Sequence, residues 1–131
     1  MVAELTVAVV SAERSIWQGK AKSIVAKTPD GEIGVLPGHS PVLALLLEAP
    51  LRIETVDGVK VLVAVHGGFF SVDSDRVNVI AETAELAEEI DVERAKAALE
   101  RARQAAGGPD DPEAAAAKRA ETRLAVAVGT R

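Results

Sequence analysis

The pattern of hydrophobic residues changes abruptly near residue 83, and this change limits the folds that the chain can adopt. Before it, short β-branched runs are separated by turn signals at roughly the 8 to 12 residue spacing of antiparallel sandwiches and barrels. After it, alanine and charged residues dominate, and apolar residues recur every three or four positions. The sequence therefore predicts an α+β chain with an N-terminal antiparallel β-sandwich (or flattened barrel) over 1–84 and a C-terminal α-helical hairpin over 85–131.

Three turn signals divide the first region. In Thr28 to Gly31, proline sets φ, aspartate bonds its own backbone and glycine supplies a positive φ. Asp57-Gly58, between two β-rich runs, predicts a β-hairpin with a tight primed turn. Asp73 to Asp75 predicts a further turn. The longest strand-like run, Ser15 to Lys27, is amphipathic.

The second region carries the signals of two helices. Asp91 is a candidate N-cap, and Gly107 to Pro109 ends the first helix. Asp111 then caps a second helix that begins at Pro112. The two predicted apolar stripes are Val92, Ala95, Leu99, Ala102 and Ala106, and Ala117, Ala120, Leu124 and Val128.

The alanine content of these stripes has an energetic consequence. Small side chains bury little area, and burial contributes about 25 cal/mol per Å². We therefore expect the hairpin to be only marginally docked on the sandwich. An element held so weakly can be released by a ligand or partner of modest affinity.

Composition and charge exclude several classes of protein. The 131 residues allow one domain with an appendage, and a net charge of −5 with dispersed Lys and Arg argues against binding to nucleic acid or to an anionic membrane surface. The absence of cysteine excludes disulfides, thiolate metal sites and thiol catalysis. The N-terminal MVAELTV lacks signal-peptide features, and the longest apolar run, Val42 to Leu47, is far short of the roughly 20 residues of a membrane span. These features predict a soluble chain.

The candidate catalytic groups do not form a recognisable set. His39 precedes Ser40, and His66 precedes two glycines, but the chain has no Gly-x-Ser-x-Gly turn and no phosphate-binding glycine loop. A hydrolytic triad built on Ser40 would have to use the distant His66. Two isolated histidines also make a poor metal-ligand set, so no metal is expected. We interpret His66 as a strand residue before a glycine bulge, and the sequence does not favour an enzyme.

Charged residues of the second region suggest an anion site. Arg94 and Arg101 share one helix face, and Arg119 and Arg123 share another, so a hairpin can bring the two faces to one anion. The alternative is that these arginines are solvated, with Arg94 at most pairing loosely to Asp91. Spacing alone favours the solvated arginines and leaves the anion site as the second interpretation.

Four stretches carry a resemblance to a known family: Val9 to Glu13, Gly31 to Pro41, Gly67 to Phe69, and Val77 to Glu85. With them, the chain resembles the epsilon subunit of bacterial F-type ATP synthases, the counterpart of the mitochondrial delta subunit. The order of a β-sandwich followed by a helical hairpin agrees with that family.

The resemblance implies a non-catalytic rotor subunit of a proton-translocating ATP synthase. It implies contacts with the gamma subunit and the c-ring, and with the alpha/beta head when the hairpin extends and hinders ATP hydrolysis. It also implies a peripheral position on the cytoplasmic face of the plasma membrane, reached only through the complex. In the family the matching loop lies toward the ring, so the candidate interface residues are Glu32, Pro37, Gly38, His39 and Ser40. Of these, Glu32 is the expected polar contact, and His39 is a structural or interface residue.

A motif of the family also bears on nucleotide binding. Some bacterial members bind ATP on the folded hairpin through Ile or Leu, Asp, two residues, Arg and Ala, which Ile90 to Ala95 matches. The resemblance thus implies ATP as a regulatory ligand, with no cofactor required. The candidate nucleotide-binding residues are Glu85, Asp91, Arg94, Ala95, Arg101, Arg119 and Arg123. The connector Gly107 to Pro112 and the alanine-rich second helix depart from the family's more charged hairpins. A free-standing ATP-sensing module is the alternative function.

Overall fold

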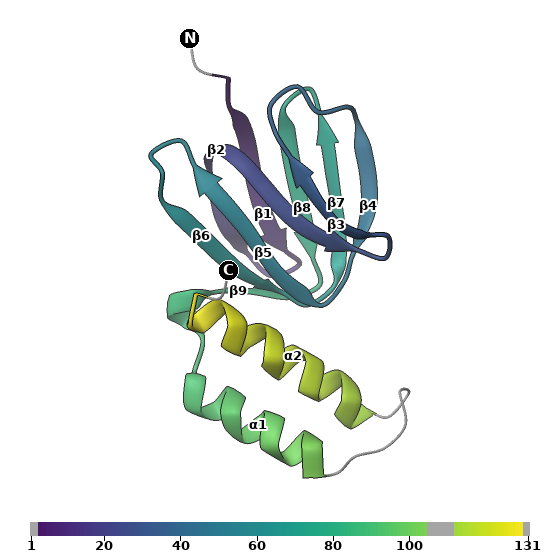
Figure 1. Ribbon diagram of the computed structural model, residues 1–131, viewed down its shortest axis with the longest axis vertical. Helices are drawn as coiled ribbons and strands as arrows, with labels where there is room; N and C mark the ends of the chain where they lie inside the picture. Colours follow the sequence, from purple (N-terminus) through teal and green to yellow (C-terminus); the bar gives the residue numbers. More distant parts are fainter. Residues whose placement is uncertain (1–2, 105–111, 130–131) are drawn as a thin grey trace.

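The computed structural model describes residues 3–104 and 112–129, which form a β-sandwich with two helices packed below it (Figure 1). The strands of these residues are β1 Leu5–Ser11, β2 Ser15–Thr28, β3 Gly31–Val35, β4 Val42–Leu46, β5 Ala49–Thr55, β6 Lys60–Val65, β7 Gly68–Asp73, β8 Arg76–Ala81 and β9 Ala84–Leu86. A 3-10 turn η1 (Ala87–Glu89) leads to α1 (Val92–Gln104) and α2 (Pro112–Ala127). The predicted fold class is confirmed.

The strands form one folded-over sheet. Their order is β4-β7-β8-β1-β2-β5-β6-β9, with β3 paired to β2, and β1 runs parallel to β8 while the other pairs are antiparallel. The long strand β2 joins the two layers, because its first half pairs with β1 and its second half with β3 and β5. The register shift between Ala21 and Ser23 marks the place where β2 passes from one layer to the other.

The core follows from the alternation of side chains along the strands. In β8 every second residue of Arg76–Ala81 is buried, and the same alternation begins β1. Phe70 of β7 is the largest of the fully buried side chains, and Val, Ile and Leu supply most of the others. This core supports the sandwich without any contribution from the helices.

The turns of the β5–β6 and β7–β8 hairpins can be compared with the turns that the sequence predicts. Asp57-Gly58 does lie in the β5–β6 hairpin, but only Gly58 has a positive φ (83°), and its N–H donates to the carbonyl of Thr55 at 2.9 Å. The predicted two-residue primed turn is therefore wrong, because the loop has three residues and glycine occupies its last position. A hairpin turn with two positive φ values is found at Ser74-Asp75, between β7 and β8.

The helices form two layers under the sandwich, with α2 between the sheet and α1 (Figure 1). The predicted stripe of α1 is confirmed at Ala95, Leu99 and Ala102. In α2 the prediction is partly wrong, since Val128 is exposed and Thr122 and Val126 are buried together with Ala120. At 100° per residue, Ala120 lies on the side of the helix opposite to Thr122 and Val126. A helix between two layers buries two faces, which a single stripe does not describe.

Local helix signals agree with the structure where it can be compared. The carboxylate of Asp91 accepts the backbone N–H of Arg94 at 3.0 Å, so Asp91 is the N-cap of α1. α2 begins at Pro112 as predicted. The predicted roles of Ala106, Gly107 to Pro109 and Asp111 lie outside the described residues. β9 crosses the proposed boundary between 84 and 85, and this boundary stays a prediction.

Candidate functional site

A cavity of about 320 Å³ opens between the two helices and the chain that enters them. The residues around it come from β9, η1, the cap of α1 and both helices. They are Glu85, Glu89, Asp91, Arg94, Ala95, Ala98, Arg101, Ala116, Arg119 and Arg123. All seven residues predicted to bind a nucleotide thus surround one cavity. Nucleotide binding itself stays a prediction.

The charges around this cavity are unequally neutralised. Arg123 donates from Nε to Oε1 of Glu85 at 2.6 Å, which joins α2 to β9. Within residues 3–104 and 112–129, the exposed side chains of Arg94, Arg101 and Arg119 form no ion pair. Three guanidinium groups are therefore open to solvent or to an anion, which agrees with both sequence interpretations.

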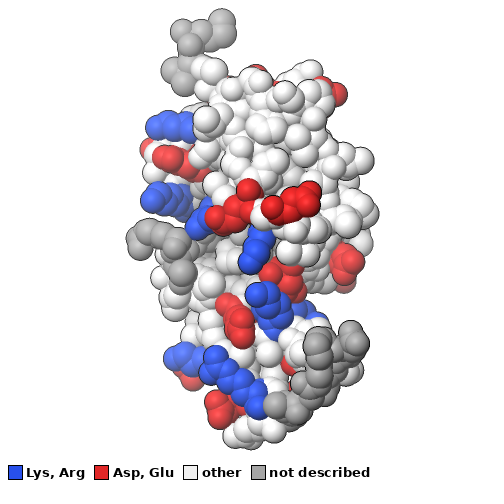
Figure 2. Space-filling view, turned by 45° about the vertical axis from the view of Figure 1, so that its right-hand side comes forward, with Lys and Arg blue, Asp and Glu red and all other residues white. Residues whose placement is uncertain are grey.

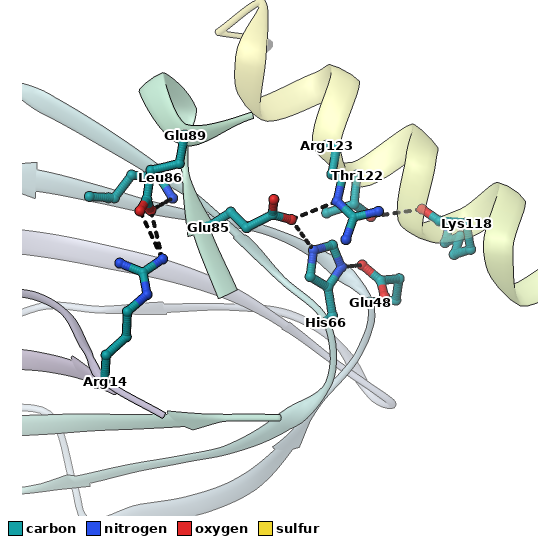
Figure 3. Close-up of polar contacts among 9 residues, drawn as sticks. All are labelled: Arg14, Glu48, His66, Glu85, Leu86, Glu89, Lys118, Thr122 and Arg123. Carbon is teal, nitrogen blue, oxygen red and sulfur yellow. Dashed lines mark hydrogen bonds and ion pairs between the residues drawn. The ribbon is translucent and has the colours of Figure 1, made fainter. Parts of the chain in front are cut away.

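His66 connects the sandwich to this site through its contact with Glu85, which lines the cavity (Figure 3). It lies between β6 and β7, where its backbone N–H donates to Thr83, and its side chain is only 3% exposed. Its Nδ1 lies 2.6 Å from Oε2 of Glu48 and its Nε2 lies 2.9 Å from Oε1 of Glu85. Both ring nitrogens face carboxylates, so neither is left for a serine hydroxyl. His66 follows β6 directly and precedes Gly67 and Gly68, both with positive φ, close to the predicted place at the end of a strand, but its carboxylate partners were not predicted.

The pKa of the Glu85 carboxyl reflects this environment. Partial burial acts to raise it, but the hydrogen bonds from Arg123 and His66 outweigh burial and hold the pKa below its usual value of 4.5. Glu89 behaves similarly, because hydrogen bonds from Arg14 and from the backbone N–H of Leu86 lower its pKa. Each carboxylate is thus stabilised in its charged form.

Sequence reasoning missed three members of this polar region: Glu48, Arg14 and Glu89. Arg14 lies in the β1–β2 turn and pairs with Glu89 of η1 at 2.8 Å, 75 residues along the chain. Glu48 follows the apolar run of β4 and meets His66 only after the sheet has folded over. The pairing of a buried histidine with carboxylates 18 and 19 residues away leaves no local signal.

The predicted interface residues separate into two places. Glu32 near the start of β3 forms an ion pair with Arg52 of β5 and lines a second cavity beside α2. Pro37 to Ser40 follow the far end of β3, where Gly38 (φ 90°) donates its N–H to Asp75 at 2.7 Å. At about 3.3 Å per residue, the remainder of β3 and the turn place these groups on the order of 10 Å apart or more. Glu32 lies near the hairpin, and the loop lies at the opposite end of the sandwich (Figure 1).

An apolar row crosses the outer face of three neighbouring strands. Leu45 of β4 is paired with Phe69 of β7, which is paired with Ile80 of β8. These side chains are 52%, 51% and 54% exposed, and Leu43 beside them is 76% exposed. Figure 2 shows that charged side chains gather over the hairpin, the adjoining part of the sandwich and the left edge of this view, and that the upper right part carries few.

Comparisons with known proteins agree over almost the whole chain. Residues 4–87 match the family model of the ATP synthase delta/epsilon chain β-sandwich domain. The ATP synthase epsilon chain of Streptomyces griseus is 52% identical over 129 residues, covering 98% of this chain and 99% of the relative. That of Rhodococcus jostii is 54% identical over 99 residues, covering 75% and 81%. A chain in the cryo-EM structure of the Euglena gracilis mitochondrial ATP synthase (OSCP/F1/c-ring) superposes with a TM-score of 0.72 at 28% identity, covering 98% of this chain and 79% of that one.

Proposed function

The chain belongs to the delta/epsilon chain family of ATP synthases, and we propose that it couples rotation of the membrane ring to the catalytic head through the gamma subunit. Its relatives are ATP synthase epsilon chains, and within the proposal it is a central-stalk subunit of this membrane-associated complex. No helix among residues 3–104 and 112–129 is long and apolar enough to cross a bilayer. Within the proposal, the chain is non-catalytic and reaches the cytoplasmic face of the membrane through its partners.

The apolar row is the observation that carries the docking part of this proposal. A continuous row of Leu45, Phe69 and Ile80 on the outside of a sheet is typical of an interaction surface. Burying such side chains stabilises an interface by roughly 1.5–3 kcal/mol each when burial is complete. We assign this face to the gamma subunit, and the loop Pro37 to Ser40 to the c-ring.

The loop has the rigidity that a docking surface needs. Pro37 and Gly38 occupy a turn in which the N–H of His39 donates to the carbonyl of Leu36 at 3.1 Å. Nδ1 of His39 lies 2.6 Å from the carbonyl of Ser40. The carboxylate of Asp75, in the turn between β7 and β8, accepts the backbone N–H of Gly38. His39 therefore stabilises the conformation of the loop. Within the proposal, the exposed side chains of Leu36 and Ser40 contact the partner.

A charge placed in the apolar row tests the docking surface. Phe69→Glu introduces a carboxylate where the proposal buries an aromatic ring, and we expect the variant to be lost from purified ATP synthase. Val59→Glu is the matched control, since Val59 is 58% exposed in the β5–β6 turn, away from the row. Retention of the Phe69→Glu chain in the complex at the level of the control would overturn this assignment.

Recovery of the unaltered chain from detergent-solubilised membranes without stalk or head subunits would overturn the coupling role itself.

The second part of the proposal concerns the cavity of the hairpin. Arg94, Arg101 and Arg119 surround a space of about 320 Å³ whose remaining lining includes small alanines, and the size is within the range of ligand pockets. We assign it to ATP, which supplies the phosphates for these groups and holds the hairpin folded. When ATP leaves, the hairpin extends toward the alpha/beta head and hinders hydrolysis.

Isothermal titration of the isolated chain with ATP tests this second part. Arg101→Gln is expected to weaken binding at least tenfold, because it removes one charge-assisted contact to phosphate. Arg103→Gln is the matched control, an exposed arginine on the same helix that does not line the cavity. The absence of binding heat at millimolar ATP would contradict the assignment.

A complex assembled with residues 1–90 alone should hydrolyse ATP faster than one with the whole chain.

A further inference from the structure

We propose that His66 is the positioning residue of a latch, formed by Glu48, His66, Glu85 and Arg123, that sets how strongly the hairpin docks on the sandwich. The four residues come from the turn between β4 and β5, the connection between β6 and β7, strand β9 and helix α2. Successive contacts of 2.6, 2.9 and 2.6 Å link them in that order (Figure 3). The inference rests on the movable hairpin of the proposed function, but it requires neither ATP nor a partner.

Hydrogen-bond counting shows why His66 joins its neighbours. A neutral imidazole carries one N–H, whereas His66 faces a carboxylate oxygen at each ring nitrogen. Both contacts are hydrogen bonds when both nitrogens carry a hydrogen, and the cluster then holds two cations and two carboxylates. Because the side chain is only 3% exposed, the ring cannot exchange either carboxylate for bulk water without a local opening.

Glu85 transmits the effect of His66 to the helix. Its atom Oε1 accepts from both His66 Nε2 and Arg123 Nε, so one oxygen serves the sandwich and the hairpin at once. If His66 no longer holds this carboxylate, Glu85 gains rotamers that do not meet Arg123. Fixing the acceptor in advance lowers the entropy cost of docking the guanidinium.

The latch matters because, among the described residues, the apolar contact between the hairpin and the sandwich is small. Its apolar contact with the sandwich is a small cluster of Ala64, Ile90 and Val126, with Leu62 and two alanines at its edge. The sandwich has a separate and far larger core. A polar link of this kind is therefore a substantial part of the docking free energy.

The far end of the latch lies beside the proposed docking face. Glu48 follows Leu47 directly, and β4 carries the exposed Leu43 and Leu45. A partner that shifts the end of β4 changes the distance from Glu48 to His66 and thereby the position of Glu85. The latch thus gives the docking face a physical route to the hairpin through groups in contact.

A double-mutant cycle between Glu48 and Arg123 tests the relay, since no hydrogen bond or ion pair joins these two side chains directly in the described structure. The chain has no cysteine, so Asp57→Cys and Ala115→Cys, both at exposed positions, accept a donor and an acceptor dye in random order. Energy transfer then reports the ratio of docked to released hairpin in the isolated chain. Trp17, the single tryptophan, reports whether the sandwich remains folded.

We expect Glu48→Gln and Arg123→Gln each to lower the docked ratio and to be coupled by at least about threefold. In a His66→Gln background the coupling should vanish, because one amide nitrogen cannot donate to carboxylates on opposite sides. Glu13→Gln, in the exposed β1–β2 turn, is the control that should show no coupling to Arg123→Gln. Additive effects of Glu48→Gln and Arg123→Gln, or coupling that survives in His66→Gln, would overturn the latch. If Trp17 shows that His66→Gln is unfolded, the cycle in the unaltered background still decides between coupling and independence.

Discussion

The sandwich and the hairpin of this chain are stabilised in different ways. In the sandwich, large β-branched and aliphatic side chains from both layers form one continuous core around Phe70. In the described part of the hairpin, half of the buried helix positions are alanine, and the apolar contact with the sheet is the small cluster around Val126. The segment between the two regions, β9 and η1, is fixed by the ion pairs of Glu85 with Arg123 and of Glu89 with Arg14.

This difference teaches how one short chain can be both a fixed part and a movable one. The sandwich is stable on its own contacts, so a partner can dock on its outer face without ordering it. The hairpin depends on a few contacts, so its position can respond to a ligand or to a neighbour. Substitutions in the sandwich should therefore change its unfolding in urea, whereas substitutions in the hairpin should change the energy transfer that reports docking.

The largest effect is expected in the sandwich core. Phe70→Ala leaves a cavity at a side chain that is 1% exposed and should lower the free energy of unfolding by about 3–5 kcal/mol. Urea unfolding followed by Trp17 fluorescence measures this loss. Leu43→Ala, at an exposed position, should change it by less than about 0.5 kcal/mol. Equal losses in the two variants would remove the distinction between core and docking face.

A smaller and more local effect is expected in the hairpin. Val126→Ala removes two methyl groups from the contact with Ala64 and Ile90, at roughly 0.8 kcal/mol each. Energy transfer between the labelled positions should show hairpin release, while the urea midpoint reported by Trp17 changes little. Val128→Ala, 70% exposed, is the control and should do neither. Loss of the sandwich together with the hairpin would show that the two regions unfold as one.

Acidification should also act on the connection rather than on the sandwich. Glu85 and Glu89 have pKa values below the usual 4.5, so their stabilising contribution is complete above that pH and is lost as the pH falls through the lowered values. Hairpin docking measured by energy transfer should therefore decrease as the pH falls below about 4.5, through the lowered pKa values of these two carboxyls. Glu85→Gln should weaken docking at pH 7 and flatten this acid transition. Unchanged docking down to pH 3 would contradict the role of these carboxylates.

The smallest effect is expected at the exposed pair of Glu32 and Arg52. Exposed ion pairs contribute about 0–1 kcal/mol and are screened by salt. Glu32→Gln should change the urea stability by no more than this amount, and 0.5 M salt should abolish the difference. The predicted contact of Glu32 with the c-ring is tested with the same variant, whose loss from purified ATP synthase would support that contact and whose full retention would contradict it.

Features with a local physical cause could be predicted from the sequence. The alternation in Arg76–Ala81 and the cap at Asp91 need only their own neighbours along the chain, and both appear in the structure. The environment of His66 could not be predicted, because it depends on carboxylates that the folded sheet brings from two other elements. The second buried face of α2, at Thr122 and Val126, likewise depends on the helix lying between two layers.

Hydrogen exchange of the isolated chain tests the central claim most directly. We expect amides of α1 and α2 to exchange through local opening whose free energy is several-fold smaller than that of β1 and β8 and is nearly independent of low urea concentrations. Val126→Ala should speed exchange in α2 and leave β1 and β8 unchanged. If helices and central strands share one opening free energy and one urea dependence, the chain is a single cooperative unit and the account of a fixed sandwich with a conditional hairpin is wrong.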